Sequence, residues 1–135
     1  MTLLQITKLY LLTVPVFFAI DLLWLGVIAR GFYRDNLAHL LSPTVNWSAA
    51  VLFYLLFIAG ILYFATMPAL AEGSVRRALI NGALFGFFTY MTYDLTNLAT
   101  LPDWPLKVVV VDMLWGTVLC AAVAVSAFYI GRWLS

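Results

Sequence analysis

The sequence predicts an all-α integral membrane protein, a four-helix bundle with a short interfacial helix between helices 1 and 2. Composition is the first reason, because 65% of the 135 residues are hydrophobic and only 10% are charged, which is too apolar for an ordinary soluble domain. The second reason is that four stretches reach the roughly 20 residues that a helix needs to cross a bilayer. They form one transmembrane domain over residues 1–135, with spans at about 9–29, 47–67, 78–98 and 108–130.

The distribution of basic residues indicates an orientation for these spans. Cytoplasmic loops of membrane proteins carry more Lys and Arg than the loops on the other side. Four basic residues would share the side of the N-terminus and three would lie opposite, which favours both termini in the cytoplasm. The first group is Lys8, Arg76, Arg77 and Arg132, and the second is Arg30, Arg34 and Lys107.

The segment between the first two spans has a helical pattern of its own. Tyr33, Leu37 and Leu40 recur at helical spacing, while Arg34 and His39 lie around the other sides. This pattern is typical of a short amphipathic helix on a membrane surface. Two interpretations remain open at this point: an ordinary anchored connection, or a lid over a polar site.

Three aspartates inside the predicted spans are the most informative feature of the chain. Asp21, Asp94 and Asp112 each lie in an otherwise apolar stretch, where an acid costs about 2.5 to 3.5 kcal/mol on insertion scales. No Lys or Arg lies at a comparable depth to pair with them. Each acid therefore needs a hydrogen-bonding partner, a proton or a function.

Depth counting places the three acids together. At 1.5 Å per residue from the span ends, all three lie very roughly 6 to 12 Å inside the same leaflet, the one that carries the first and third loops. Helices 1, 3 and 4 can then build one polar pocket, with the second span as a lipid-facing wall. The residues predicted to bind a ligand or couple it to protons are Asp21, Asp94, Asp112, Asn97, Tyr90, Tyr93, Trp24 and Trp115.

Small residues recur at four-residue steps in the third span. Ala78, Gly82 and Gly86 form a row that lets another helix approach closely. Packing against a helix of the same chain is one interpretation. A homodimer built through Gly82 and Gly86 is the other.

Several segments together resemble the bacterial DUF2177 family of predicted membrane proteins. The resemblance covers nearly the whole chain and implies a bacterial inner-membrane protein with four spans, but no biochemical function or catalytic residue. The run YDLTNLAT is the specific part. The segments are Tyr93 to Thr100, Trp104-Pro105, Val111 to Gly116, Asp21 to Trp24, and Phe32-Tyr33.

The chemistry expected of the site follows from its acids. Desolvation and like charge oppose the ionisation of three neighbouring carboxyls, so at least one should hold a proton near neutral pH. We expect the pocket to bind or translocate a small cationic or amphipathic molecule with coupled protonation. The alternatives are a membrane enzyme doing acid/base chemistry on a lipid or isoprenoid, and a structural or accessory subunit whose acids tie helices together.

Other classes of site find little support in the residues. His39 is the only histidine, which excludes a haem held by two histidines of one chain. No DxD or DDxxD motif is present to hold a diphosphate-bound metal, so neither a metal nor a cofactor is predicted. A net charge of +1 without a basic run argues against nucleic acid. The expected partners are the bilayer, a small amphipathic or lipid-soluble ligand, and in the dimer interpretation a second copy.

Overall fold

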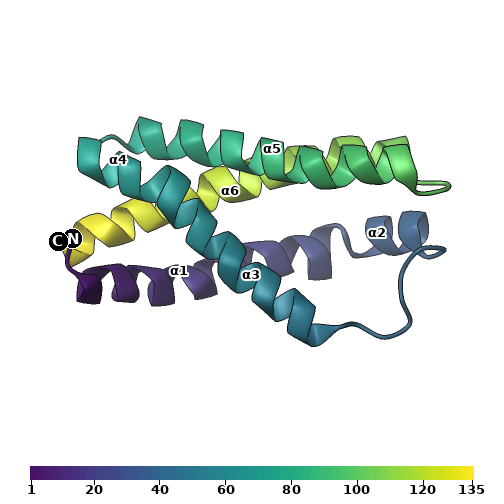
Figure 1. The fold of residues 1–135 in the computed structure, drawn as a ribbon, viewed down its shortest axis with the longest axis horizontal. Helices are drawn as coiled ribbons and strands as arrows, with labels where there is room; N and C mark the ends of the chain where they lie inside the picture. The colour runs from purple at the N-terminus through teal and green to yellow at the C-terminus, as the bar shows by residue number, and fades with distance from the viewer.

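The computed structural model describes residues 1–135, and every regular element in it is helical. Two short π-helical segments, η1 and η2, continue the α-helices that precede them, so the chain forms four long rods. The rod that contains α3 crosses the others at an angle, and both termini lie at one end of the molecule (Figure 1). The elements are α1 (Leu3–Leu23), η1 (Trp24–Ile28), α2 (Arg30–Leu37), α3 (Trp47–Ile61), η2 (Leu62–Thr66), α4 (Met67–Glu72), α5 (Val75–Thr100) and α6 (Leu106–Leu134).

Three of the four rods are long and apolar enough to cross a membrane: Leu3–Ile28, Trp47–Glu72 and Leu106–Leu134. The predicted all-helical membrane fold is therefore confirmed for these three spans. The remaining rod, α5, has 26 residues, a sufficient length at 1.5 Å per residue. It is less apolar because its second half carries many hydroxyl and amide side chains.

Polar residues set where the rods begin. Thr2 and Gln5 form a capping box at the start of α1, in which each side chain accepts a hydrogen bond from the backbone N–H of the other. Asn46 caps α3 and Ser74 caps α5 in the same manner, through side-chain oxygens that accept backbone N–H groups. Such caps satisfy donors that have no partner within the helix. Gly73, at φ 66°, ends α4 in the left-handed conformation that glycine adopts most easily.

A seam of small residues joins α5 to α6. These two helices make the most extensive contact in the molecule and run side by side in Figure 1. Ala78, Gly82 and Gly86 are all buried in this seam. A Cβ atom on Gly82 would lie 2.7 Å from the Cβ of Ala124, and one on Gly86 would overlap the carbonyl oxygen of Gly116.

The small-residue row therefore serves packing within the chain, the first of the two interpretations. A homodimer through Gly82 and Gly86 would need both glycines to be exposed, whereas α6 covers them here. Whether two copies of the chain associate stays a prediction.

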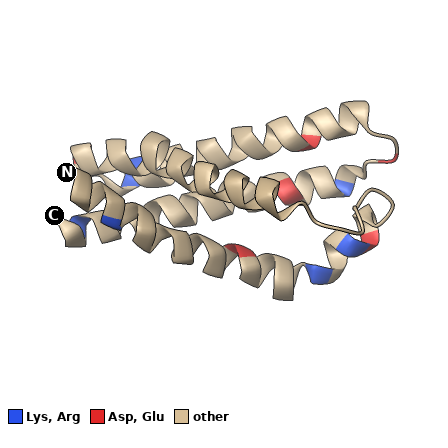
Figure 2. Cartoon of the chain, turned by 60° about the horizontal axis from the view of Figure 1, so that its bottom comes forward, with Lys and Arg blue, Asp and Glu red and all other residues tan.

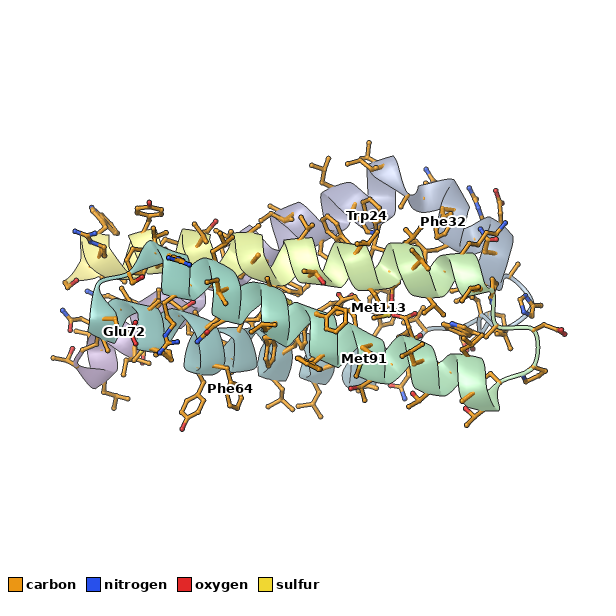
Figure 3. The ribbon with its side chains drawn as sticks, turned by 90° about the horizontal axis from the view of Figure 1, so that it is seen from above. Trp24, Phe32, Phe64, Glu72, Met91 and Met113 are labelled. Atoms are coloured by element: carbon orange, nitrogen blue, oxygen red, sulfur yellow. The ribbon has the colours of Figure 1, made fainter.

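The break between η2 and α4 is stabilised from α5. Pro68 has no N–H, so the carbonyl of Phe64 loses the partner that a regular helix would supply. Asn81 of α5 donates a hydrogen bond from Nδ2 to this carbonyl oxygen at 3.1 Å. The ring of Phe64 itself projects away from the helices (Figure 3).

The short helix predicted between the first two spans is present as α2. Its side chains Leu37 and Tyr33, together with Leu40 just beyond its end, belong to a cluster with the loop residue Trp104 and with Val108 at the start of α6. The apolar face is thus directed toward the protein, where a membrane surface was expected. Figure 3 shows Phe32 of α2 beside Trp24 of η1, at the end of the molecule opposite Glu72.

Candidate functional site

The three aspartates of interest, Asp21, Asp94 and Asp112, lie in the half of the molecule far from the termini. Figure 2 shows one acidic position inside each of α1, α5 and α6 in that half. Their side chains are buried: Asp21 is 5% exposed, Asp94 is 0% and Asp112 is 8%. The one ion pair of the structure, Arg77 with Glu72, is at the other end. None of the three acids has a basic partner, as the sequence predicted.

A cavity of about 410 Å³ brings two of these acids together. Asp21 and Asp112 both contribute to its wall, and most of the eleven residues that line it are aromatic. Phe53 of α3 and Tyr93 of α5 line the cavity although more than half of each side chain is exposed. The cavity therefore reaches the outer surface of the protein at these two residues.

Two tryptophans hold Asp21. The Nε1–H of Trp115 donates a hydrogen bond to Asp21 Oδ1 at 3.2 Å. The ring of Trp24 stacks on Trp115, with centroids 4.5 Å apart and planes 7° from parallel. Trp24 is the first residue of η1, and short π-helical segments in α-helices occur frequently at functional sites because the wider turn redirects side chains.

A hydrogen-bonded chain from the same tryptophan reaches Asp112. Trp24 donates from Nε1 to the hydroxyl of Tyr33 at 3.1 Å, and Tyr33 donates that hydroxyl to Asp112 Oδ1 at 2.8 Å. Burial raises the pKa of Tyr33, and the nearby charge of Asp112 raises this pKa further. The phenol is therefore a neutral donor at physiological pH. Trp24 thus links the surroundings of both cavity acids.

Asp94 differs from the other two acids because it has no donor. It lies on α5 within hydrogen-bonding range of Asp112 of α6, fully buried, and neither of its carboxyl oxygens accepts a hydrogen bond from an N–H or hydroxyl group. Asp94 does not line the cavity. A buried carboxyl without partners is costly as a charged group, which makes Asp94 a residue that stability alone does not explain.

Some of the predicted site residues line the cavity, and the others lie outside its lining. Asp21, Asp112, Tyr90, Tyr93 and Trp115 line it. Trp24 supports two of them from outside, whereas Asp94 and Asn97 are not part of the lining. Asn97 lies within hydrogen-bonding range of Tyr93, which lines the cavity.

The second span makes a contribution that the sequence did not predict. It was expected to be a lipid-facing wall, yet α3 supplies Phe53, Tyr54 and Phe57 to the cavity. That expectation is wrong for this face of the helix. The hydroxyl of Tyr54, in an otherwise apolar run, was the sequence feature that could have indicated this contribution. The remaining unpredicted lining residues are Leu25, Tyr33 and Thr89.

The acids do not form a conventional metal centre. No group of three or more His, Cys, Asp or Glu side chains is arranged so that it could hold a metal ion. Hard cations such as Ca²⁺ take six to eight oxygen ligands. The arrangement is better suited to protons, or to a ligand whose positive charge needs one or two carboxylates.

Comparison with known proteins identifies the family. A family model described as "Predicted membrane protein (DUF2177)" matches residues 6–129. No curated protein and no solved structure matches the chain.

Proposed function

The chain belongs to the DUF2177 family of predicted membrane proteins, and we propose that it binds a small cationic or amphipathic molecule in its cavity in exchange for a proton. The observation that carries this proposal is a cavity whose wall contains two carboxyls and no basic side chain. A positive ligand would supply the counter-charge that the protein lacks. Acids buried inside a membrane protein commonly serve such ligand and proton pathways.

The proposal includes α5 as a fourth membrane crossing. Both termini lie at the same end of the molecule (Figure 1), which agrees with an even number of crossings. Four threonines of α5 bond back to carbonyls of their own helix, which reduces the cost of placing their hydroxyls in lipid. These are Thr89, Thr92, Thr96 and Thr100. The proposal puts the chain in the inner membrane of a bacterium, where the excess of basic residues on the side of the termini supports a cytoplasmic location for both.

The proton would be exchanged at the pair formed by Asp94 and Asp112. The two carboxyls lie close together with no cation between them, and two like charges at this spacing are unfavourable in a low-dielectric interior. One proton on the pair relieves this repulsion. A positive charge that arrives beside Asp112 removes the need for that proton, so binding and proton release are coupled. Groups that face this pair are Tyr33 of α2, Tyr93 of α5 and Asp21 of α1.

Proton release on binding of a hydrophobic cation tests this function. Purified protein in weakly buffered detergent is titrated with tetraphenylphosphonium while a pH indicator records released protons. Wild-type protein should release up to one proton per bound cation, and affinity should rise with pH by up to about tenfold per unit. Asp112→Asn cannot change charge and should release none.

Asp35→Asn is the matched control, because Asp35 is an exposed acid of α2 outside the cavity. It should release protons as wild type does. Cation binding without proton release by the wild type, or unchanged release by Asp112→Asn, would contradict the coupling. Translocation is tested by the same cation in proteoliposomes, where an imposed proton gradient should drive its uptake.

A further inference from the structure

The cavity wall is made of aromatic faces arranged around two acids. Rings come from four elements: Tyr33 from α2, Tyr54 and Phe57 from α3, Tyr90 from α5 and Trp115 from α6. Several of these rings also pack on one another, such as Phe57 against Tyr90 with centroids 6.2 Å apart. The wall is therefore a connected aromatic enclosure rather than a set of isolated side chains.

Each cavity acid is oriented through one of its oxygens. The hydrogen bonds from Trp115 and Tyr33 both end on Oδ1 atoms, of Asp21 and Asp112 respectively. Tyr54 also lies within hydrogen-bonding range of Asp21, and Asp94 lies within that range of Asp112. The two cavity carboxyls are therefore surrounded by neutral donors and one further acid, with no positive charge beside them.

Aromatic enclosures with nearby carboxylates favour a particular class of cation. The face of an aromatic ring attracts a positive charge, most strongly where water is excluded, and quaternary ammonium groups are recognised in this way. A small inorganic cation would need several oxygen ligands in place of its water. Here only two residues of the wall carry a negative charge, and no group of three or more His, Cys, Asp or Glu side chains is arranged to hold a metal ion.

We propose that the ligand is an organic ammonium compound, with an alkylated nitrogen against the aromatic rings and an apolar group beside it. This inference rests on the proposed function and specifies its substrate class. The cavity of about 410 Å³ lies at the small end of the range of about 300–1,000 Å³ for small-molecule sites. Its opening between Phe53 and Tyr93 faces outward from the helices, so an amphipathic ammonium compound can enter from the lipid.

A pair of isosteric compounds tests the need for positive charge. Benzyltrimethylammonium and neopentylbenzene have the same shape, but only the first is charged. Binding to wild-type protein in nanodiscs is measured by calorimetry, with protein-free nanodiscs as the blank and potassium chloride titrated separately. We expect the ammonium compound to bind at least tenfold more tightly than its uncharged isostere, and potassium not to bind.

A matched pair of variants tests the aromatic wall. Phe53 lines the cavity and is 51% exposed, while Phe88 of α5 does not line it and is 53% exposed. Because both are exposed, replacing either with Leu should leave the fold intact. Phe53→Leu should weaken benzyltrimethylammonium binding by about three- to tenfold and change neopentylbenzene binding little, and Phe88→Leu should change neither.

The outcomes separate this inference from the proposed function. If potassium or tetraphenylphosphonium binds with proton release while benzyltrimethylammonium does not, the ammonium class is overturned and proton-coupled binding stands. If benzyltrimethylammonium and neopentylbenzene bind equally well, the protein does not recognise the positive charge. If Phe53→Leu and Phe88→Leu weaken benzyltrimethylammonium binding equally, the aromatic wall does not recognise the ligand. If no cation binds, both proposals fall.

Discussion

The two halves of the α5–α6 interface have opposite character. Toward the termini, Ala78, Gly82 and Gly86 bring the helices close, with no polar side chain of the row in need of a partner. Toward the loops, the same two helices carry Asp94 and Asp112, and the space beside them widens into the cavity. One half is organised for close packing, and the other contains buried acids that close packing does not require.

Gly116 and Tyr90 mark the boundary between these halves. A Cβ atom on Gly116 would overlap the ring of Tyr90, so the ring occupies the space that this glycine leaves free. Tyr90 is thereby held at the edge of the cavity, which it lines. The comparison suggests that the small-residue half supplies the stability that allows the other half to keep costly polar groups.

The largest effect on stability is expected in the small-residue half. Gly86→Ala places a Cβ against the backbone of α6 and should lower the free energy of unfolding by about 1–3 kcal/mol. Gly26→Ala is the control, because nothing lies within 4 Å of its added atom, and it should be neutral or slightly stabilising. Denaturant titration in mixed micelles measures both. Equal stability of the two variants would remove the distinction between the halves.

A smaller effect is expected from the hydrogen-bonded chain at the cavity. Tyr33→Phe deprives Asp112 of its donor and Trp24 of its acceptor, which should cost about 1–2 kcal/mol in the same titration. Tyr63→Phe, at an exposed tyrosine outside the cavity, should be neutral. A neutral Tyr33→Phe variant would mean that α2 does not close over the site in the membrane.

The smallest effect concerns the bond that stabilises the η2–α4 break. Asn81→Leu leaves the carbonyl of Phe64 without its donor. Polar contacts between membrane helices average about 0.6 kcal/mol, so the unfolding free energy should fall by roughly that amount. Proton release on cation binding should not change, because Asn81 is distant from the cavity lining. A loss of proton release in this variant would connect the two halves functionally.

Much of the fold could be predicted because the membrane imposes strong length and polarity requirements. Three spans, the short helix α2 and the small-residue row follow from counting apolar residues and their spacing. The direction of the apolar face of α2 could not be predicted, since Leu37 and Tyr33 suit a membrane surface as well as the protein surface around Trp104. The two π-helical segments could not be predicted from the spacing of apolar residues either, because a single added residue per turn leaves no distinctive sequence signal.

Part of the candidate site could be predicted because the membrane also makes polar residues stand out in the sequence. A charged residue in an apolar run is conspicuous, so Asp21 and Asp112 could be found together with the aromatic residues near them. Phe53 and Phe57 could not, because a phenylalanine that lines a cavity looks the same in sequence as one that faces lipid. Depth counting predicted that Asp94 lies near the other acids, and it is close to Asp112. It could not show that Asp94 lies outside the cavity wall.

The central claim is that the acids of the loop half are kept for function rather than for stability, and Asp94→Leu tests it most directly. Asp94 accepts no hydrogen bond from an N–H or hydroxyl group and faces a second acid, Asp112, so an apolar residue of similar size should leave the unfolding free energy unchanged or raise it by about 1–3 kcal/mol. The same variant should lose proton release on titration with tetraphenylphosphonium. A variant that is destabilised by several kcal/mol yet still releases protons would contradict the account, because Asp94 would then be a structural residue.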